Sequence, residues 1–378
     1  MTRPRVIPID AAQAEQPGAD TLIDWPLPPL QEAAGELAPL FEGALVTYRD
    51  GRRLTGQLMR FSPATGLMEF CPERAAIAHV LAVENPLDPK PLDRIRLQAG
   101  AELRENVDRL VRKPNGIFIV CCPTGSGKST TLHSILGHIN KADCEIWTAE
   151  DPVEIQQEGL RQVQVNPKAG WTIAAAMRAV LRANPDVIMV GEMRDEETAQ
   201  IAIEASLTGH TVFSTLHTNN AVDSVVRLLD MGVQPFNFAD SLLGVLAQRL
   251  VRRLCPACRV AEPLDEARVV ALANEYCADT PQQPRAMVAE WEGRYGPLQL
   301  WIAPGCDDCR GAGFRGRLGV HELFINVPAT APLIHRRAEA RELRALALQG
   351  GMRTLKQDGI EKCLQGHTDL NEVRGACG

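Results

Sequence analysis

The fold of this chain is decided by the stretch Cys122-Pro123-Thr124-Gly125-Ser126-Gly127-Lys128-Ser129-Thr130. It matches a phosphate-binding loop except at its first position, where Cys122 replaces glycine. In such a loop backbone N–H groups face the phosphates, the lysine contacts the β- and γ-phosphate oxygens, and the serine ligates magnesium. We therefore expect residues 123–130 to bind Mg-ATP, with Ser129 on the magnesium ion. Cys122 leaves the strength of nucleotide binding open.

Strand-sized apolar runs alternate with helical patterns around this loop. The run 117–120 leads into the loop and a helical pattern follows it, which is the context that the motif requires. Further strands are predicted at 145–148, 187–190 and 211–216, and helices at 103–111, 171–183 and 196–207. The alternation predicts an α/β fold of the P-loop NTPase (RecA-like) type, with a mostly parallel sheet and right-handed crossovers.

Polar residues stand where the predicted strands end. In chain order these residues are Lys128, Glu150, Glu192 and His217. Because the carboxyl ends of parallel strands form one edge of a sheet, we expect these groups to converge there as a nucleotide-hydrolysis site. In this interpretation Glu150 orients the attacking water, Glu192 supports magnesium and His217 senses the γ-phosphate.

These assignments have structural alternatives. Glu150 could instead cap a helix or pair with Arg194, and His217 could be a hydrogen-bonded structural histidine. His210 is a weaker candidate than His217. Asp186 begins its strand, at the end away from the phosphates, so we do not expect it to bind the metal.

Eleven cysteines occur in the chain, and two CxxC pairs stand out among them. The pairs are Cys255 with Cys258 and Cys306 with Cys309, separated by the insertion 259–305. A tetrahedral zinc site with four thiolate ligands is the economical interpretation, and with no open coordination position the zinc would be structural. The alternative is two unrelated exposed pairs.

The charge balance is acidic, since 40 Lys and Arg against 47 Asp and Glu give a net charge of −7. This is the wrong sign for a protein that coats nucleic acid, so we expect no nucleic-acid partner. The apolar runs are too short to span a membrane, and the first residues lack a secretory signal, which predicts the reducing cytosol. The spacing from Leu242 to Leu250 predicts a helix, with Arg249, Arg252 and Arg253 on its solvated face.

A chain of 378 residues is longer than one hydrophobic core usually organises, so several domains are expected. Asp50-Gly51 and the break at 62–66 lie between apolar segments and predict antiparallel hairpins, and the proline-rich stretch 84–92 is typical of a linker. The predicted division is a partly disordered lead-in (1–40), a small β-rich module (41–90), the P-loop core (91–250), a tetracysteine zinc subdomain (251–325) and a helical C-terminal region (326–378).

Ordered motifs along the chain resemble those of one family, the GspE/PilB-like secretion ATPases of type II secretion and type IV pilus assembly. The family's Walker A, Asp box, Walker B and His box resemble, in order, Pro123-Thr-Gly-Ser-Gly-Lys-Ser-Thr-Thr-Leu, Glu150-Asp-Pro-Val-Glu, Asn184-Pro-Asp-Val-Ile-Met-Val-Gly-Glu-Met-Arg-Asp and Gly209-His-Thr-Val-Phe-Ser-Thr-Leu-His-Thr-Asn. Leu254-Cys-Pro-Ala-Cys and Gly305-Cys-Asp-Asp-Cys resemble its zinc element. The resemblance covers residues 97 to 375.

This resemblance implies a homo-hexameric ring motor in the cytoplasm, attached peripherally to the inner membrane. The motor would bind ATP, an inner-membrane platform protein and cytoplasmic assembly proteins, and would use ATP hydrolysis to assemble pilin-like subunits. The zinc element favours the assembly and secretion branch over the retraction ATPases. Arg178 and Arg182, one helical turn apart, are candidates for support of the nucleotide within the same chain.

Two departures from the family pattern leave an alternative open. The family's larger N-terminal domain, with arginines that reach the nucleotide, has no match in the residues before the core, and Cys122 breaks the loop pattern. The alternative function is a nucleotide-binding, slow or non-hydrolysing paralogue that regulates a ring formed by a full-length relative.

Overall fold

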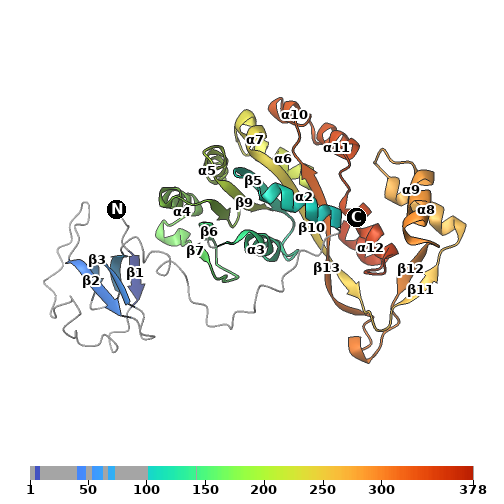
Figure 1. Cartoon of the computed structure of the whole chain (residues 1–378), viewed down its shortest axis with the longest axis horizontal. Helices are drawn as coiled ribbons and strands as arrows, with labels where there is room; N and C mark the ends of the chain where they lie inside the picture. Colours follow the sequence, from blue (N-terminus) through green and yellow to red (C-terminus); the bar gives the residue numbers. More distant parts are fainter. Residues whose placement is uncertain are drawn as a thin grey trace. The chain divides into compact units, whose positions relative to one another are not determined.

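The computed structural model describes residues 101–141 and 143–377, together with the backbone of strands at 5–8, 41–47, 53–62 and 67–72 (Figure 1). The chain divides into two units, Met1–Glu84 and Asn85–Gly378. Three predicted features lie outside the described residues: the hairpin turn at residues 50 and 51, the remainder of the lead-in (1–4 and 9–40) and the proline-rich stretch 84–92.

The first unit contains a four-stranded antiparallel sheet. Its strands lie in the order β1 (Arg5–Pro8), β4 (Leu67–Pro72), β3 (Arg53–Ser62) and β2 (Phe41–Thr47). The sheet confirms the β-rich module predicted from the sequence. Residues 5–8, within the predicted lead-in, form strand β1, which pairs with β4 and thereby gives its backbone groups hydrogen-bond partners.

A seven-stranded sheet forms the centre of the second unit (Figure 1). Its order is β13 (Phe314–Ile325), β10 (Leu242–Leu254), β5 (Gly116–Cys121), β9 (Thr211–Leu216), β8 (Val187–Val190), β6 (Ile146–Glu150) and β7 (Leu160–Gln164). Neighbours from β10 to β7 are parallel, while β13 runs antiparallel to β10. The structure confirms the predicted mostly parallel P-loop NTPase sheet.

Helices flank this sheet and bury its central strand β5 along its whole length. Phe118 of β5 packs in one cluster with side chains from two helices. These are Val107 and Leu110 of the helix 101–111 and Leu132 and Leu136 of the helix 128–139. The helices of the core are α2 (Ala101–Val111), α3 (Lys128–Ile139), α4 (Ile173–Val180), α5 (Glu196–Leu207), α6 (Ala221–Asp230) and α7 (Pro235–Ser241), with the 3-10 turns η4 (Pro167–Ala169) and η5 (Leu181–Ala183).

Strand β10 corrects the helix predicted between Leu242 and Leu250. The segment pairs in parallel with β5 and antiparallel with β13, and its residues 242–248 are all buried. A central strand covered on both faces has no polar alternation, so its continuous apolar run can match a helical spacing by chance. Of its arginines, Arg252 pairs with Glu372 at 2.6 Å.

The segment between the two CxxC pairs forms a small subdomain. Strands β11 (Val260–Pro263) and β12 (Gln299–Ile302) pair with each other, and α8 (Glu266–Cys277) packs on α9 (Pro284–Tyr295) around the buried Tyr276 and Trp291. The helical C-terminal region contains α10 (Ala331–His335), α11 (Ala340–Gln349), α12 (Leu355–Leu364) and α13 (Leu370–Cys377). The boundary predicted at residue 250 falls inside β10.

Helix length and polarity bear on the membrane prediction. Within the described residues, every helix is too short or too polar to cross a bilayer.

Candidate functional site

The phosphate-binding loop connects β5 to α3, as the motif requires. Gly125 and Gly127 take the left-handed backbone, with φ of 79° and 85°. A Cβ atom at Gly127 would also come within 3.0 Å of Gln248 Nε2. Glycine is therefore required at Gly127 by both the backbone conformation and the neighbouring strand β10.

Lys128 lies at the centre of the polar edge of the sheet. Its Nζ donates to the carbonyl oxygens of Cys122 (3.0 Å) and Pro123 (3.4 Å) and lies 3.3 Å from His217 Nδ1. The other ring nitrogen of His217, Nε2, lies 3.1 Å from Glu192 Oε1. Groups from the carboxyl ends of β5, β9 and β8 are therefore brought into one chain of contacts, as the sequence predicted.

A cavity of about 1420 Å³ opens over this edge. The loop residues Thr124, Lys128 and Ser129 line it together with Glu150 and Glu192. Arg194 pairs with Glu192, its Nε lying 2.8 Å from Oε2, and not with Glu150. The structure thus excludes the predicted structural alternative in which Glu150 pairs with Arg194.

Glu150 ends strand β6 and is buried, with 5% of its surface exposed. Its Oε1 accepts hydrogen bonds from Thr148 Oγ1 (2.5 Å) and Gln162 Nε2 (3.0 Å). Its Oε2 lies 3.5 Å from His133 Nε2. Glu150 is thus a buried carboxylate that two hydrogen bonds anchor through Oε1 at the rim of a phosphate cavity, a place from which it can orient a water.

The hydroxyl of Ser129 donates to Glu154 Oε2 at 2.6 Å. The Ser129 hydroxyl and the carboxylates of Glu154 and Glu192 all line the cavity, and magnesium prefers such oxygen ligands. The residues present therefore fit Mg-ATP. Glu154 was missed by the sequence reasoning, although it ends the quoted stretch that begins at Glu150.

Gln248 was missed as well, because its segment was predicted to be a helix. From β10 its Nε2 donates to the carbonyl of Ser126 (2.6 Å), and its Oε1 accepts from Thr131 Oγ1 (2.7 Å). This buried amide thus holds the loop and the first turn of α3 together. No motif signals it, since the contact depends on the pairing of β10 with β5.

The side chain of Cys122 lies in the apolar core and not in the cavity. Burial raises the pKa of this thiol to about 12. The carbonyl oxygen of Cys122 is the atom that faces Lys128. The departure from glycine therefore changes the core beneath the loop and leaves the face toward the phosphates intact.

We expect Cys122→Gly to leave the Kd for ATP within about threefold of the parent, while the free energy of unfolding falls by about 1–2 kcal/mol because a buried side chain is lost. Gly125→Ala is the matched control and should weaken ATP binding, since alanine disfavours the left-handed backbone. Fluorescent-nucleotide titration and thermal unfolding measure both quantities. A change in ATP affinity above about tenfold in Cys122→Gly would contradict this account.

The remaining sequence candidates lie farther from this site. Arg178 pairs with Glu197 at 2.5 Å, and Arg182 is exposed on η5; neither lines the nucleotide cavity. His210 contacts the carbonyl of Ala205, just before β9 begins. The carboxylate of Asp186 accepts from the backbone N–H of Glu145, before β6 and β8 begin, so it lies at the end of the sheet opposite the phosphates, as predicted.

The two CxxC pairs come together in space, as the sequence predicted. Sulfur atoms of Cys255 and Cys306 lie 3.9 Å apart, those of Cys258 and Cys309 also 3.9 Å, and those of Cys306 and Cys309 3.8 Å. All four ligand atoms lie within 4.8 Å of one another. A tetrahedron with Zn–S bonds of about 2.3 Å has sulfur atoms about 3.8 Å apart, so the cluster fits zinc.

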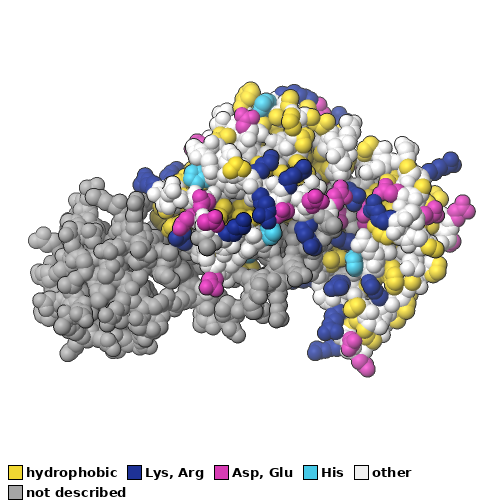
Figure 2. Space-filling model, viewed as in Figure 1, with side chains coloured by type: hydrophobic (Ala, Val, Ile, Leu, Met, Phe, Trp, Pro, Cys, Tyr) yellow, Lys and Arg dark blue, Asp and Glu magenta, His cyan; other side chains and the backbone are white. Residues whose placement is uncertain are grey.

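Backbone N–H groups support thiolate character at Cys309. Cys309 Sγ accepts from the N–H groups of Cys306 and Gly313, each at 3.2 Å. The hydrogen bond from Cys306 is the main cause that lowers the pKa of Cys309 to about 7. The 3-10 turn η6 (Asp307–Cys309) brings the Cys309 sulfur beside the backbone N–H group of Cys306. Basic and acidic side chains lie close together on the surface of the second unit (Figure 2), and Arg315 and Arg317, which follow the second CxxC pair in the chain, are exposed.

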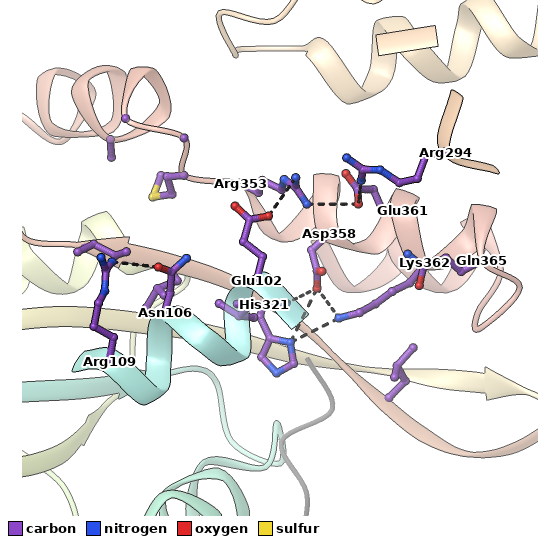
Figure 3. Close-up of a pocket in the computed structure, with 18 of the residues that line it drawn as sticks. Glu102, Asn106, Arg109, Arg294, His321, Arg353, Asp358, Glu361, Lys362 and Gln365 are labelled. Atoms are coloured by element: carbon purple, nitrogen blue, oxygen red, sulfur yellow. Dashed lines mark hydrogen bonds and ion pairs between the residues drawn. The ribbon is translucent and has the colours of Figure 1, made fainter. Parts of the chain in front are cut away.

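A second cavity, of about 860 Å³, is lined by residues of α2, β13 and α12 (Figure 3). Its charged groups pair with one another: Arg353 lies 3.3 Å from both Glu102 and Glu361, and Arg294 lies 3.3 Å from Glu361. These ion pairs join the insertion helix α9 to α12 and α2. The charges of this cavity therefore hold elements of the fold together.

His321 of β13 lines both cavities. Burial, and then the nearby Lys362, lower the pKa of His321 to about 3, so the ring is neutral. Lys362 Nζ lies 2.5 Å from Asp358 Oδ2, which also accepts from the backbone N–H of His321 (Figure 3). His321 thus contributes to the walls of both cavities, with Lys362 and Asp358 beside it in the second cavity.

A phosphate-binding loop on a mostly parallel sheet, with two carboxylates and a histidine at the same edge, defines a P-loop nucleoside-triphosphatase fold. Residues 87–375 match the family described as "Type II/IV secretion system protein". The chain belongs to this family.

Curated relatives agree with this assignment. The chain is 46% identical over 270 residues to the type II secretion system protein E of Aeromonas hydrophila, covering 71% of this chain and 50% of that protein. It is 45% identical over 269 residues to the type IV pilus assembly ATPase PilB of Thermus thermophilus, covering 71% and 28% of the two chains. The chain thus spans about half the length, or less, of these relatives.

Among solved structures, the pilus retraction motor PilT with bound ADP resembles the chain with a TM-score of 0.53 and 24% identity. The match covers 88% of this chain and 76% of that one. At this identity the likeness supports the fold alone.

Proposed function

We propose that this chain is the ATP-hydrolysing motor of a type II secretion or type IV pilus assembly system. The observation that carries the proposal is the chain of contacts from Lys128 through His217 to Glu192, with the buried Glu150 at the same sheet edge. Relatives named as secretion or pilus assembly ATPases at 45–46% identity support the same reading.

In this mechanism Lys128 binds the β- and γ-phosphates, and Ser129 ligates magnesium with support from Glu192. Glu150 would orient the attacking water from its position in the wall of the cavity. His217 contacts both Lys128 and Glu192, so its ring can report whether the γ-phosphate is present. Magnesium, when bound with ATP, neutralises the charge that develops on the transferred phosphoryl group.

The proposed setting follows the same relatives. The chain would form a homo-hexamer in the cytoplasm, attached peripherally to the inner membrane through a platform protein and cytoplasmic assembly proteins. The tetracysteine cluster would hold structural zinc. Arg178 and Arg182 remain candidates for support of the nucleotide, with Glu197 as the present partner of Arg178.

Within the described residues, no feature favours the alternative of a slow or non-hydrolysing regulatory paralogue. The groups proposed for Mg-ATP hydrolysis share one cavity, and Cys122, which raised the doubt, faces the core.

We expect the purified chain to form a hexamer when a non-hydrolysable ATP analogue and magnesium are present, because ring ATPases of this kind place nucleotide between neighbouring subunits. Mass photometry over a range of protein concentrations measures the assembly state. Lys128→Ala, which removes the phosphate contact, is the control that should stay disassembled at the same analogue concentration. A monomer under every condition would contradict the ring and favour the regulatory paralogue.

A further inference from the structure

His133 is a buried polar residue that the proposed mechanism does not yet use. It lies on α3 beyond the phosphate-binding loop, and 1% of its surface is exposed. Its Nε2 has no hydrogen-bond partner within the described residues, and His133 is among the residues that line the nucleotide cavity. The carboxylate oxygen Oε2 of Glu150 lies 3.5 Å from this nitrogen. A buried ring nitrogen without a partner is costly, so its position 3.5 Å from the Glu150 carboxylate calls for a role.

Gln157 determines which ring nitrogen of His133 carries the proton. The Gln157 amide satisfies its neighbours when its oxygen accepts from Gly137 N–H (3.0 Å) and its nitrogen donates to the His133 carbonyl (3.2 Å) and to Nδ1 (3.1 Å). In this orientation Nδ1 is an acceptor, so the proton of the neutral ring must be on Nε2. The nitrogen that carries the proton is then the one that lies 3.5 Å from Glu150 Oε2.

The two oxygens of Glu150 are held differently. Oε1 accepts from Thr148 and Gln162, whereas the donor near Oε2 is His133. A carboxylate anchored at one oxygen can still rotate about the terminal bonds of its side chain. A donor at the second oxygen removes that rotation. Catalytic hydrogen bonds are often long before the nucleotide complex forms and tighten in it.

We propose that His133, with its tautomer fixed by Gln157, is a positioning residue that donates from Nε2 to Glu150 and holds its carboxylate toward the attacking water. The proposal rests on the proposed function, because it assigns a role for the same site. His133 acts through Glu150 and does not itself contact ATP, so its loss should lower kcat while substrate binding is preserved.

The first experiment compares steady-state ATP hydrolysis and ATP binding in His133→Phe and His133→Gln. Phenylalanine keeps a ring but removes the donor, and we expect kcat to fall about 10- to 100-fold with KM and the Kd for ATP within about threefold. Glutamine places a side-chain N–H near the Nε2 position and should restore kcat to within about fivefold of the parent. His138→Phe, on the same helix but exposed, is the matched control and should leave kcat unchanged.

A kcat within twofold of the parent in folded His133→Phe would overturn the proposal, as would a matching loss of ATP binding or a failure of glutamine to rescue. Should His133→Phe unfold, Gln157→Met tests the same contact from the loop side. This variant keeps His133 but removes the amide that donates to Nδ1, so the ring can carry its proton on either nitrogen. An unchanged kcat in Gln157→Met would also overturn the proposal.

A second readout does not depend on turnover. In protein labelled with ¹⁵N-histidine, the His133 ring should be the neutral Nε2–H tautomer, and its Nε2–H resonance should shift in Glu150→Gln. A ring protonated on Nδ1, or a signal indifferent to Glu150→Gln, overturns the positioning role. Absence of ATP hydrolysis by the parent chain would instead count against the proposed function, and the spectrum would still decide the contact.

Discussion

Replacing Glu150 by glutamine is expected to lower the rate of phosphate release at least about 100-fold while ATP binding is retained. Glu150 is buried at the carboxyl end of β6, and its oxygens face donors from Thr148, Gln162 and His133. Glutamine has nearly the same shape but offers an amide where the mechanism needs a carboxylate beside the attacking water. Steady-state phosphate release and titration with a fluorescent ATP analogue measure the two quantities.

The matched control is Glu158→Gln, which changes an exposed glutamate on the loop that follows β6. It should hydrolyse ATP at the parent rate. Glu192→Gln should lose less of the hydrolysis rate than Glu150→Gln. Glu192 supports magnesium together with other oxygen groups of the cavity and pairs with His217 and Arg194, whereas Glu150 orients the attacking water itself. Turnover above a tenth of the parent rate in Glu150→Gln would show that another group orients the water.

Removal of zinc is expected to have the largest effect on stability. The purified chain should contain one equivalent of zinc, and chelation should lower the thermal unfolding midpoint by about 5 °C or more, since structural zinc contributes directly to folding free energy. Cys309→Ser should lower the unfolding midpoint by a similar amount, because the Cys309 sulfur contacts Cys306 and accepts hydrogen bonds from two backbone N–H groups. Metal analysis by mass spectrometry and thermal unfolding with and without chelator test both statements.

Cys144→Ser is the control for this experiment, because Cys144 lies away from the cluster, packed against the main core. It should keep its zinc and respond to chelator as the parent does. Well under one equivalent of zinc in the parent, or an unfolding midpoint indifferent to chelation, would contradict the metal site.

The sequence predicted those parts of the fold that motifs and periodicity mark. Strands 187–190 and 211–216 and the helix 196–207 occur with the predicted bounds, because each is a short apolar or amphipathic segment flanked by clear turn residues. Strand β10 was mispredicted because burial on both faces removes the alternation that distinguishes a strand from a helix.

The site was predictable only where its residues follow strands directly. Lys128, Glu150 and Glu192 could be placed from the order of strands alone, and the structure brings them to one cavity. Gln248 and His133 could not, because their contacts depend on which strand lies beside the loop and on which way a buried side chain turns. These are three-dimensional facts without a local sequence signal.

Phosphate release by the purified chain, measured with and without magnesium over a range of protein concentrations, decides whether the chain is an ATP-hydrolysing motor. We expect ATP turnover that requires magnesium, rises as the ring assembles and disappears in Glu150→Gln. Tight nucleotide binding without turnover, at every concentration and in every assembly state, would contradict the motor and leave the regulatory paralogue as the better explanation.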